Sequence, residues 1–200
     1  MKIILIENSK LEYDGNSRND SKLRGAELAI INYAEELSKR GYEVQVLNNC
    51  INEKLINKVQ YTNLYKNNKK LNCEIAIVNA DAKFLDYVNS NKKFLLSHSI
   101  QNLEKFLRNR QLLPFIKHNP KILCFSKYHF NKRSFFTSIY GKEIIIPSID
   151  NDYFEVNLEN KINKNVIFYS RGDRNGNVVI DIWKKIFKKL SIKQKLYIAP

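Results

Sequence analysis

The amino-acid sequence predicts an α/β fold with a mostly parallel, doubly wound sheet, followed by the beginning of a second α/β unit. Three observations support this prediction. Apolar runs of strand length alternate with helical segments over residues 1–147, the first strand–helix–strand unit is complete, and residues 148–164 turn polar before another such unit begins. Parallel strands need long crossover connections, usually helices, so this alternation favours a parallel sheet.

The first strand–helix–strand unit has the clearest pattern. After Lys2, residues 3–6 form an apolar run, and residues 43–46 alternate polar side chains with valine, as strands do. A helix is predicted over residues 25–40, because apolar side chains recur there at helical spacing: Ala26, Ile30, Tyr33, Ala34 and Leu37. Gly41 stands where helices commonly end in a left-handed conformation. The connecting loop, residues 7–24, is long for a unit of this kind.

The rest of the first domain continues the alternation. We expect an irregular helix and a weak strand within the polar stretch 52–72. The strands are predicted at residues 59–61 (the weak one), 74–79, 93–97, 121–125 and 143–146. The helical segments are predicted at residues 81–89, from Leu103 onward with an interruption or restart at Pro114, and from Ser126 to near Gly141.

Composition divides the chain into three parts. Residues 1–147 form the predicted first domain, residues 148–164 a linker rich in Asn, Asp, Glu and Lys, and residues 165–200 the start of a second domain. The helix of the second domain carries an apolar stripe: Ile182, Trp183, Ile186, Phe187 and Leu190. A lone strand–helix–strand unit leaves sheet faces and edges uncovered, so we expect this domain to be truncated or completed in an assembly.

Hydrophobicity and cysteine content bound the class of protein. Hydrophobic residues make up 44% of the chain and aromatic residues 12%, which is enough to bury a core. No run is long and apolar enough to span a membrane, and the first residues lead into a strand instead of a signal peptide. Three widely spaced cysteines do not make a disulfide framework, so we expect a reduced, cytoplasmic protein.

The chain is strongly basic, with a formal net charge of +14. The lysines are spread over nearly every segment instead of one dense stripe, so nucleic-acid binding is the less favoured alternative. A nucleotide diphosphate or the anionic inner face of a membrane suits the same charge, which leaves peripheral membrane association open. His98, His118 and His129 show no metal-ligand spacing with cysteine or with one another, so neither a metal nor another cofactor is predicted.

A resemblance to a known family begins at the first helix. Gly-Ala-Glu opens this helix at residues 25–27, and Leu-x-x-Arg-Gly-Tyr-Glu-Val follows at residues 37–44. This pattern resembles the first unit of the GT-B glycosyltransferases, whose domains are Rossmann-like, within the large retaining family 4. Arg24 stands where that family usually has a glycine.

Further matches follow in the order of that family. They are His98 between two serines after a strand, Ser126 at a strand end, the Pro-x-x-Ile-Asp-like crossover at residues 147–150 with Phe154, and Arg171 in a loop after the next strand. Ser148 and Asn175 stand where the family usually has Asn and Lys. The matches cover nearly the whole chain.

The resemblance implies which residues form the site. The implied residues are His98 as the catalytic contact to the sugar, Gly25, Ala26, Glu27 and Ser126 at the substrate, and Arg171 and Arg174 at the donor diphosphate. A strand-end histidine that only caps its neighbours is the alternative for His98, and a solvated turn is the alternative for Arg174. Guanidinium groups suit a diphosphate because they bind oxyanions in bidentate geometry.

The implied function is that of a glycosyltransferase in carbohydrate biosynthesis. Such an enzyme transfers a sugar from a nucleotide-sugar donor to a sugar, lipid-linked or polysaccharide acceptor in the cleft between its domains, with retention at the anomeric carbon. The alternative is a non-catalytic α/β binding module, or an inactive remnant of such an enzyme. Nucleic-acid binding is the least favoured of the three.

Overall fold

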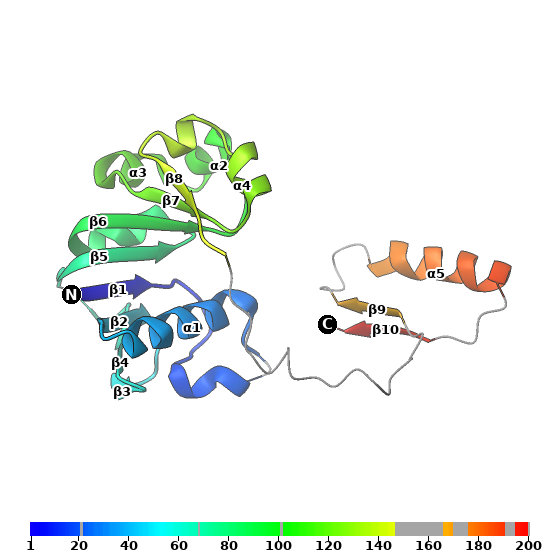
Figure 1. The fold of residues 1–200 in the computed structure, drawn as a ribbon, viewed down its shortest axis with the longest axis horizontal. Coiled ribbons are helices and arrows are strands. Elements are labelled where there is room, and N and C mark those ends of the chain that lie inside the picture. The colour runs from blue at the N-terminus through cyan, green and yellow to red at the C-terminus, as the bar shows by residue number, and fades with distance from the viewer. Residues whose placement is uncertain are drawn as a thin grey trace. The chain divides into compact units, whose positions relative to one another are not determined.

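The computed structural model describes residues 1–20, 22–67, 69–100, 102–146, 166–169, 176–190 and 195–199. The chain separates into two compact units, Met1–Ser148 and Ile149–Pro200, which we describe individually (Figure 1). The predicted linker at 148–164, the crossover residues and both predicted diphosphate-binding arginines, Arg171 and Arg174, lie outside the described residues.

The first unit is an α/β sandwich around a mostly parallel sheet, as predicted. Its described strands are β1 (Lys2–Ile6), β2 (Glu43–Asn48), β3 (Lys54–Ile56), β4 (Val59–Asn63), β5 (Leu71–Asn79), β6 (Val88–Ser97), β7 (Lys121–Cys124) and β8 (Lys142–Ile144). They lie in the order β3-β4-β2-β1-β5-β6-β7-β8. Every neighbouring pair is parallel except β3 and β4, so the sheet has the open, doubly wound topology of Rossmann-like folds.

Helices cover both faces of this sheet (Figure 1). The described α-helices of the first unit are α1 (Gly25–Lys39), α2 (Leu103–Arg108), α3 (Leu112–His118) and α4 (Lys127–Lys132), and the 3₁₀ helices are η1 (Gly15–Asn19), η2 (Ala82–Tyr87) and η3 (Phe136–Ser138). Pro114 lies in the first turn of α3, where its missing N–H has no partner to lose. The predicted segment thus forms two helices separated by residues 109–111, and Pro114 lies within the second.

Two apolar cores lie on the two faces of the sheet. Because strand side chains alternate, Ile4 and Ile6 of β1 enter one core while Leu5 enters the other. The core beside α2 and α3 includes Val78, Leu95, Phe106 and Phe115, and the core beside α1 includes Ile30, Ala34, Val46 and Leu96. Burying each such side chain is worth about 1.5–3 kcal/mol, so β1 at the centre contributes to both layers.

The polar stretch 52–72 matches its prediction in part, because the weak strand expected at residues 59–61 is present as β4. Its described residues contain no irregular helix: β3 and β4 instead form an antiparallel hairpin closed by Asn57 and Lys58. Both turn residues have positive φ, 49° and 63°, which matches the right-handed twist of the flanking strands. Asparagine tolerates this conformation, but lysine gives little sequence signal for it.

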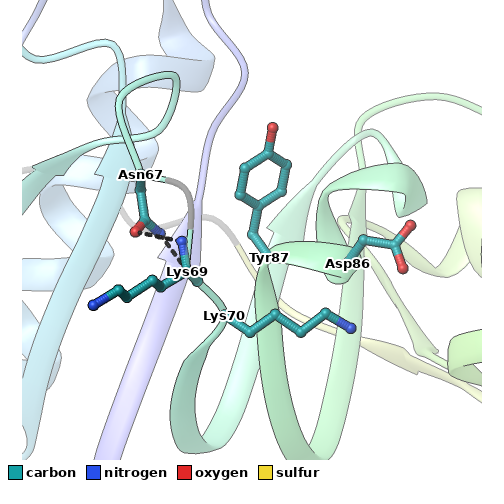
Figure 2. Close-up of a pocket in the computed structure, with 5 residues that line it drawn as sticks. All are labelled: Asn67, Lys69, Lys70, Asp86 and Tyr87. Atoms are coloured by element: carbon teal, nitrogen blue, oxygen red, sulfur yellow. Dashed lines mark hydrogen bonds between the residues drawn. The ribbon is translucent and has the colours of Figure 1, made fainter.

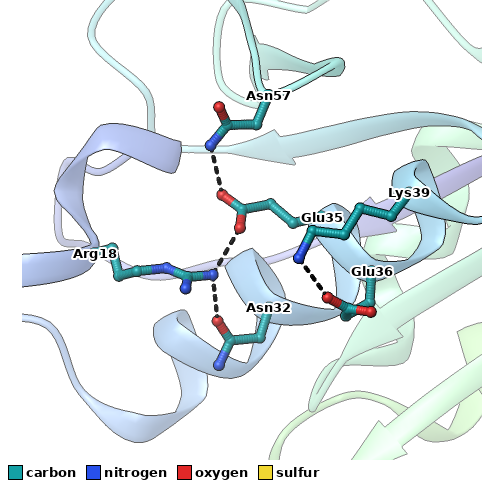
Figure 3. Close-up of polar contacts among 6 residues, drawn as sticks. All are labelled: Arg18, Asn32, Glu35, Glu36, Lys39 and Asn57. Carbon is teal, nitrogen blue, oxygen red and sulfur yellow. Dashed lines mark hydrogen bonds and ion pairs between the residues drawn. The ribbon is translucent and has the colours of Figure 1, made fainter. Parts of the chain in front are cut away.

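The long loop between β1 and α1 is tied to the helix by polar contacts (Figure 3). Arg18 of η1 donates to Glu35 Oε2 at 2.6 Å and to Asn32 Oδ1 at 2.8 Å. Asn57 of the hairpin donates to the other oxygen of Glu35 at 3.0 Å. Gly15 lies so close to the hairpin that an added Cβ would stand 2.9 Å from Ile56 Cγ2. The loop is therefore held between α1 and the hairpin.

The second unit contains a strand–helix–strand arrangement. Strands β9 (Val166–Tyr169) and β10 (Leu196–Ala199) pair in parallel, and α5 (Gly176–Leu190) connects them in sequence. On the predicted apolar stripe of α5, Ile182 is 51% exposed and Ile186 is 40% exposed. The described part of this unit thus leaves apolar side chains of α5 uncovered.

We predict that Arg18→Ala lowers the free energy of unfolding by about 1–2 kcal/mol, because it leaves the buried Glu35 carboxylate with only the amide of Asn57. Urea unfolding followed by circular dichroism measures the change. Arg40→Ala, at the exposed end of α1, is the control and should change stability by less than about 0.5 kcal/mol. Equal effects of the two substitutions would contradict the anchoring role.

Candidate functional site

The strand order reverses at β1. This strand pairs with β2 on one side and with β5 on the other, and the chain winds outward in both directions from it. Connections from the carboxyl ends of β1 and β5 therefore lead to opposite faces of the sheet. In open α/β sheets, the crevice opened by such a reversal is the usual place for a ligand.

Three side chains at the carboxyl ends of β1, β5 and β6 are connected by hydrogen bonds. Glu7 follows β1, Asn79 ends β5, and His98 follows β6. The Asn79 amide group donates to Glu7 Oε2, and the Asn79 carbonyl oxygen accepts from His98 Nε2 at 2.5 Å. This pairing places the proton of a neutral His98 on Nε2 and leaves Nδ1 as an acceptor. The His98 ring also packs against Phe125, with centroids 4.8 Å apart.

A second carboxylate lies beside these three side chains. Glu27 is in the first turn of α1 and only 4% exposed. Its Oε1 accepts from the hydroxyl of Ser9 at 2.6 Å, whereas Oε2 has no hydrogen-bond partner among the described residues. The hydroxyl of Tyr13 is buried nearby, beside Asn48. Buried polar atoms are nearly always paired, so the unpartnered Glu27 oxygen marks a place where a ligand could bond.

Burial sets the protonation of the site. Burial raises the pKa of Glu7 from 4.5 to about 7, the hydrogen bond from Asn79 opposes this, and the nearby charge of Glu27 adds to it. Burial lowers the pKa of His98, while Glu27 opposes the change. Burial also raises the pKa of Tyr13 well above its usual range. Near neutral pH, Glu7 can therefore exchange a proton while His98 is neutral.

The structure brings two of the predicted site residues, Glu27 and His98, to this edge. Gly25 and Ala26 lie in the first turn of α1, and the space where a Gly25 Cβ would be is open within 4 Å. Ser126 is exposed, and its hydroxyl accepts from the backbone N–H of His129 at 3.1 Å as the N-cap of α4. The Ser126 hydroxyl therefore has a structural role in capping the helix.

The sequence patterns did not indicate four residues at this edge: Glu7, Ser9, Tyr13 and Asn79. Glu7 and Asn79 are the polar residues that close the apolar runs of β1 and β5, which is a usable signal. Their pairing follows only when those strands are known to be neighbours. Ser9 and Tyr13 lie in the long loop, where periodicity gives no information about direction.

A cavity of about 430 Å³ lies at the opposite edge of the sheet (Figure 2). It is lined by Asn67, Lys69, Lys70, Asp86 and Tyr87. These residues stand near the amino ends of β5 and β6. Asp86 is already bound by Lys117 at 2.5 Å and by His118 at 2.9 Å. Because its one carboxylate is already paired and it lies at the amino ends of the strands, this cavity is not the candidate site.

Comparison with known proteins adds no family assignment: no protein-family model matches the chain, and no curated protein is significantly similar to it in sequence. Within the described residues, no three His, Cys, Asp or Glu side chains are grouped so that they could hold a metal ion. None of the helices in that part of the chain combines the length and apolar character needed to cross a bilayer.

We predict that stability falls as the pH rises from about 4.5 to about 7, because over this range the folded state keeps a proton on Glu7 that the unfolded chain has released. The loss amounts to about 3 kcal/mol and levels off at higher pH. Glu7→Gln should flatten this dependence and stabilise the protein at pH 8. Urea unfolding at several pH values measures it, with the exposed Glu12→Gln as control. A slope unchanged by Glu7→Gln would refute the assignment.

Proposed function

We propose that the protein is a GT-B-type glycosyltransferase whose first unit binds the acceptor at the carboxyl edge of its sheet. The observation that carries this proposal is the convergence of Glu7, Asn79, His98 and Glu27 at the strand reversal. Sugar hydroxyls donate and accept hydrogen bonds together. A site with carboxylate, amide and imidazole atoms offers partners of both kinds.

The proposed role of each residue follows from the hydrogen bonds that its free atoms can still make. The unpartnered Glu27 Oε2 can accept from an acceptor hydroxyl, and His98 Nδ1 can accept from another. Glu7 polarises the Asn79 amide, which fixes the direction of the His98 ring. These groups hold the attacking hydroxyl in place, and such positioning supplies a large part of the rate enhancement in group transfer.

The proposed reaction is a substitution at the anomeric carbon with retention. The bond from this carbon to the donor diphosphate breaks, a bond to the acceptor oxygen forms, and the hydroxyl proton passes to the departing diphosphate. Arg171 and Arg174 are the proposed donors to the diphosphate, whose negative charge grows as it leaves. The donor is a nucleotide-sugar, and the acceptor a sugar, a lipid-linked sugar or a polysaccharide. We place this reaction in the cytoplasm, with the basic surface suited to the inner face of a membrane.

A non-catalytic binding module is the second candidate, and one observation favours it. The described part of the second unit has a two-stranded sheet, and Ile182 and Ile186 on α5 are exposed. A donor site formed by these described elements alone would be open to water. In that case the first unit would bind sugars without turnover.

We predict that His98→Ala lowers turnover by about 10²-fold or more with little loss of stability, since a positioned polar group at the reacting centre typically contributes that much. Transfer from radiolabelled nucleotide-sugars to a panel of acceptors measures it. His118→Ala is the matched control, because His118 binds Asp86 at the other edge of the sheet and should affect stability only.

Equal loss of turnover in the two variants would contradict the role of His98. If the wild-type chain transfers no sugar, monosaccharide binding followed by NMR separates the two candidates. Shifts at Glu7, Glu27 and His98 without turnover indicate the binding module. Their absence refutes sugar binding at this edge.

A further inference from the structure

Arg133 is a buried cation without a partner carboxylate in the described part of the chain. It follows α4 directly and is only 4% exposed. Its Nη1 donates to the hydroxyl of Ser97 at 2.7 Å, and its Nε donates to the carbonyl oxygen of Thr137 at 3.2 Å. The guanidinium also lies 5.8 Å from the ring centre of Phe106. Nη2 has no hydrogen-bond partner among the described residues.

This arrangement is costly unless something binds there. Moving a charged group out of water costs several kcal/mol, and a neutral hydroxyl, a carbonyl and an aromatic ring recover only part of it. The cost shows in the pKa of Arg133, which burial lowers to about 10. A guanidinium held this way is well suited to receive an anion.

A second unpartnered nitrogen lies one helical turn away. His129 is 6% exposed, and its Nε2 has no hydrogen-bond partner in the described ranges. Burial lowers the pKa of His129, the charge of Arg133 lowers it further, and the carbonyl of Ser99 opposes both. His129 therefore lies near Arg133 on one side and near Ser99 on the other.

Lysine and serine side chains complete the group on its solvent side. Lys105 of α2 is half-buried and donates to the hydroxyl of Ser99 at 3.0 Å. Ser97, which accepts from Arg133, donates to the carbonyl oxygen of Ser99 at 2.9 Å and so links Arg133 to this segment. Ser99 is exposed, so an incoming group can approach from there by displacing the Lys105 contact.

The cluster adjoins the proposed acceptor site. Ser97 contacts Arg133, while the next residue, His98, contacts Asn79. His129 lowers the pKa of His98, so the two rings are close enough to interact electrostatically. One ligand can therefore reach both groups from the carboxyl edge of β6.

We propose that Arg133, His129 and Lys105 form a subsite for a phosphate monoester carried by the acceptor. The sugar part of this ligand rests on the proposed function. The phosphate part rests on the cation cluster alone. A phosphate monoester carries about −1.5 to −2 charges near neutral pH and has three strong acceptor oxygens. His129 Nε2 donates to the phosphate once the ring takes up a proton on binding, which the dianion favours. Arg133, Lys105 and protonated His129 then match a phosphate better than they match a carboxylate, which has one charge and two oxygens.

Phosphate binding can be tested with the whole chain. We expect inorganic phosphate to raise the melting temperature at constant ionic strength, as any ligand of the folded state does. Arg133→Met should abolish this rise, and it should also stabilise the protein in phosphate-free buffer by removing an unpaired buried charge. A purely structural Arg133 would give the opposite change in stability. His129→Gln should weaken phosphate binding at least about 5-fold, and Arg108→Met, exposed on α2, should leave it unchanged.

Binding measurements with three ligands test the phosphate subsite and the sugar site individually. The ligands are inorganic phosphate, glucose 6-phosphate and glucose. Tighter binding of glucose 6-phosphate than of phosphate, lost in part with His98→Ala and in part with Arg133→Met, supports both. Phosphate binding that depends on Arg133, with no added affinity from glucose, supports the subsite and refutes the sugar site. If the Arg133→Met variant binds phosphate as tightly as the wild-type protein does, the binding comes from surface lysines. That result overturns the subsite. The absence of any phosphate effect on the wild-type protein also overturns it.

Discussion

The reversal of strand order at β1 is the constraint on which the rest of the first unit depends. Because β1 pairs in parallel on both sides, its side chains must fill both cores, and Ile4, Leu5 and Ile6 do so. The same reversal sends the next connections to opposite faces and leaves the carboxyl edge open between them. Polar residues at the carboxyl ends of β1 and β5 then lie at this edge, partly shielded from water. Glu7, directly after β1, and Asn79, the last residue of β5, have this position.

Two polar groups at that edge cost the fold stability. A carboxyl group with its pKa near 7 and a second carboxylate with an unpartnered oxygen are both unfavourable in an isolated fold. The surrounding contacts compensate: Arg18 ties the β1–α1 loop to Glu35, and Ser9 in the same loop binds Glu27. The loop thus orients Glu27 at the candidate site through Ser9, and Arg18 anchors it at Glu35, away from the site. Its length, which is unusual for a strand-to-helix connection, is explained by these two tasks.

Sequence patterns predicted the fold where burial makes apolar residues recur at the spacing of a helix or strand. The apolar stripe of α1 and the runs of β1 and β5 are of this kind, because each must cover the sheet. The polar half of β6 escaped prediction, since residues 88–92 join the sheet by backbone pairing with β5 and need no apolar side chains. The β3–β4 hairpin was missed because a lysine occupies its left-handed turn. For the site, His98 and Glu27 carried a signal in the family-like motifs. The unpaired Arg133 carried none, because a lack of partners is a property of the packed structure alone.

The two groups of polar residues meet at one short segment, residues 97–99, and strand geometry explains how it serves both. Along β6, Leu95 enters the core beside α2 and Leu96 the core beside α1. Continuing this alternation turns Ser97 toward Arg133 and His98 toward Asn79, as their hydrogen bonds show. An anion at Arg133 would hold Ser97 through the guanidinium, and Ser97 holds the carbonyl of Ser99. The backbone that carries His98 is therefore fixed from both ends, so binding at one group restrains the geometry of the other.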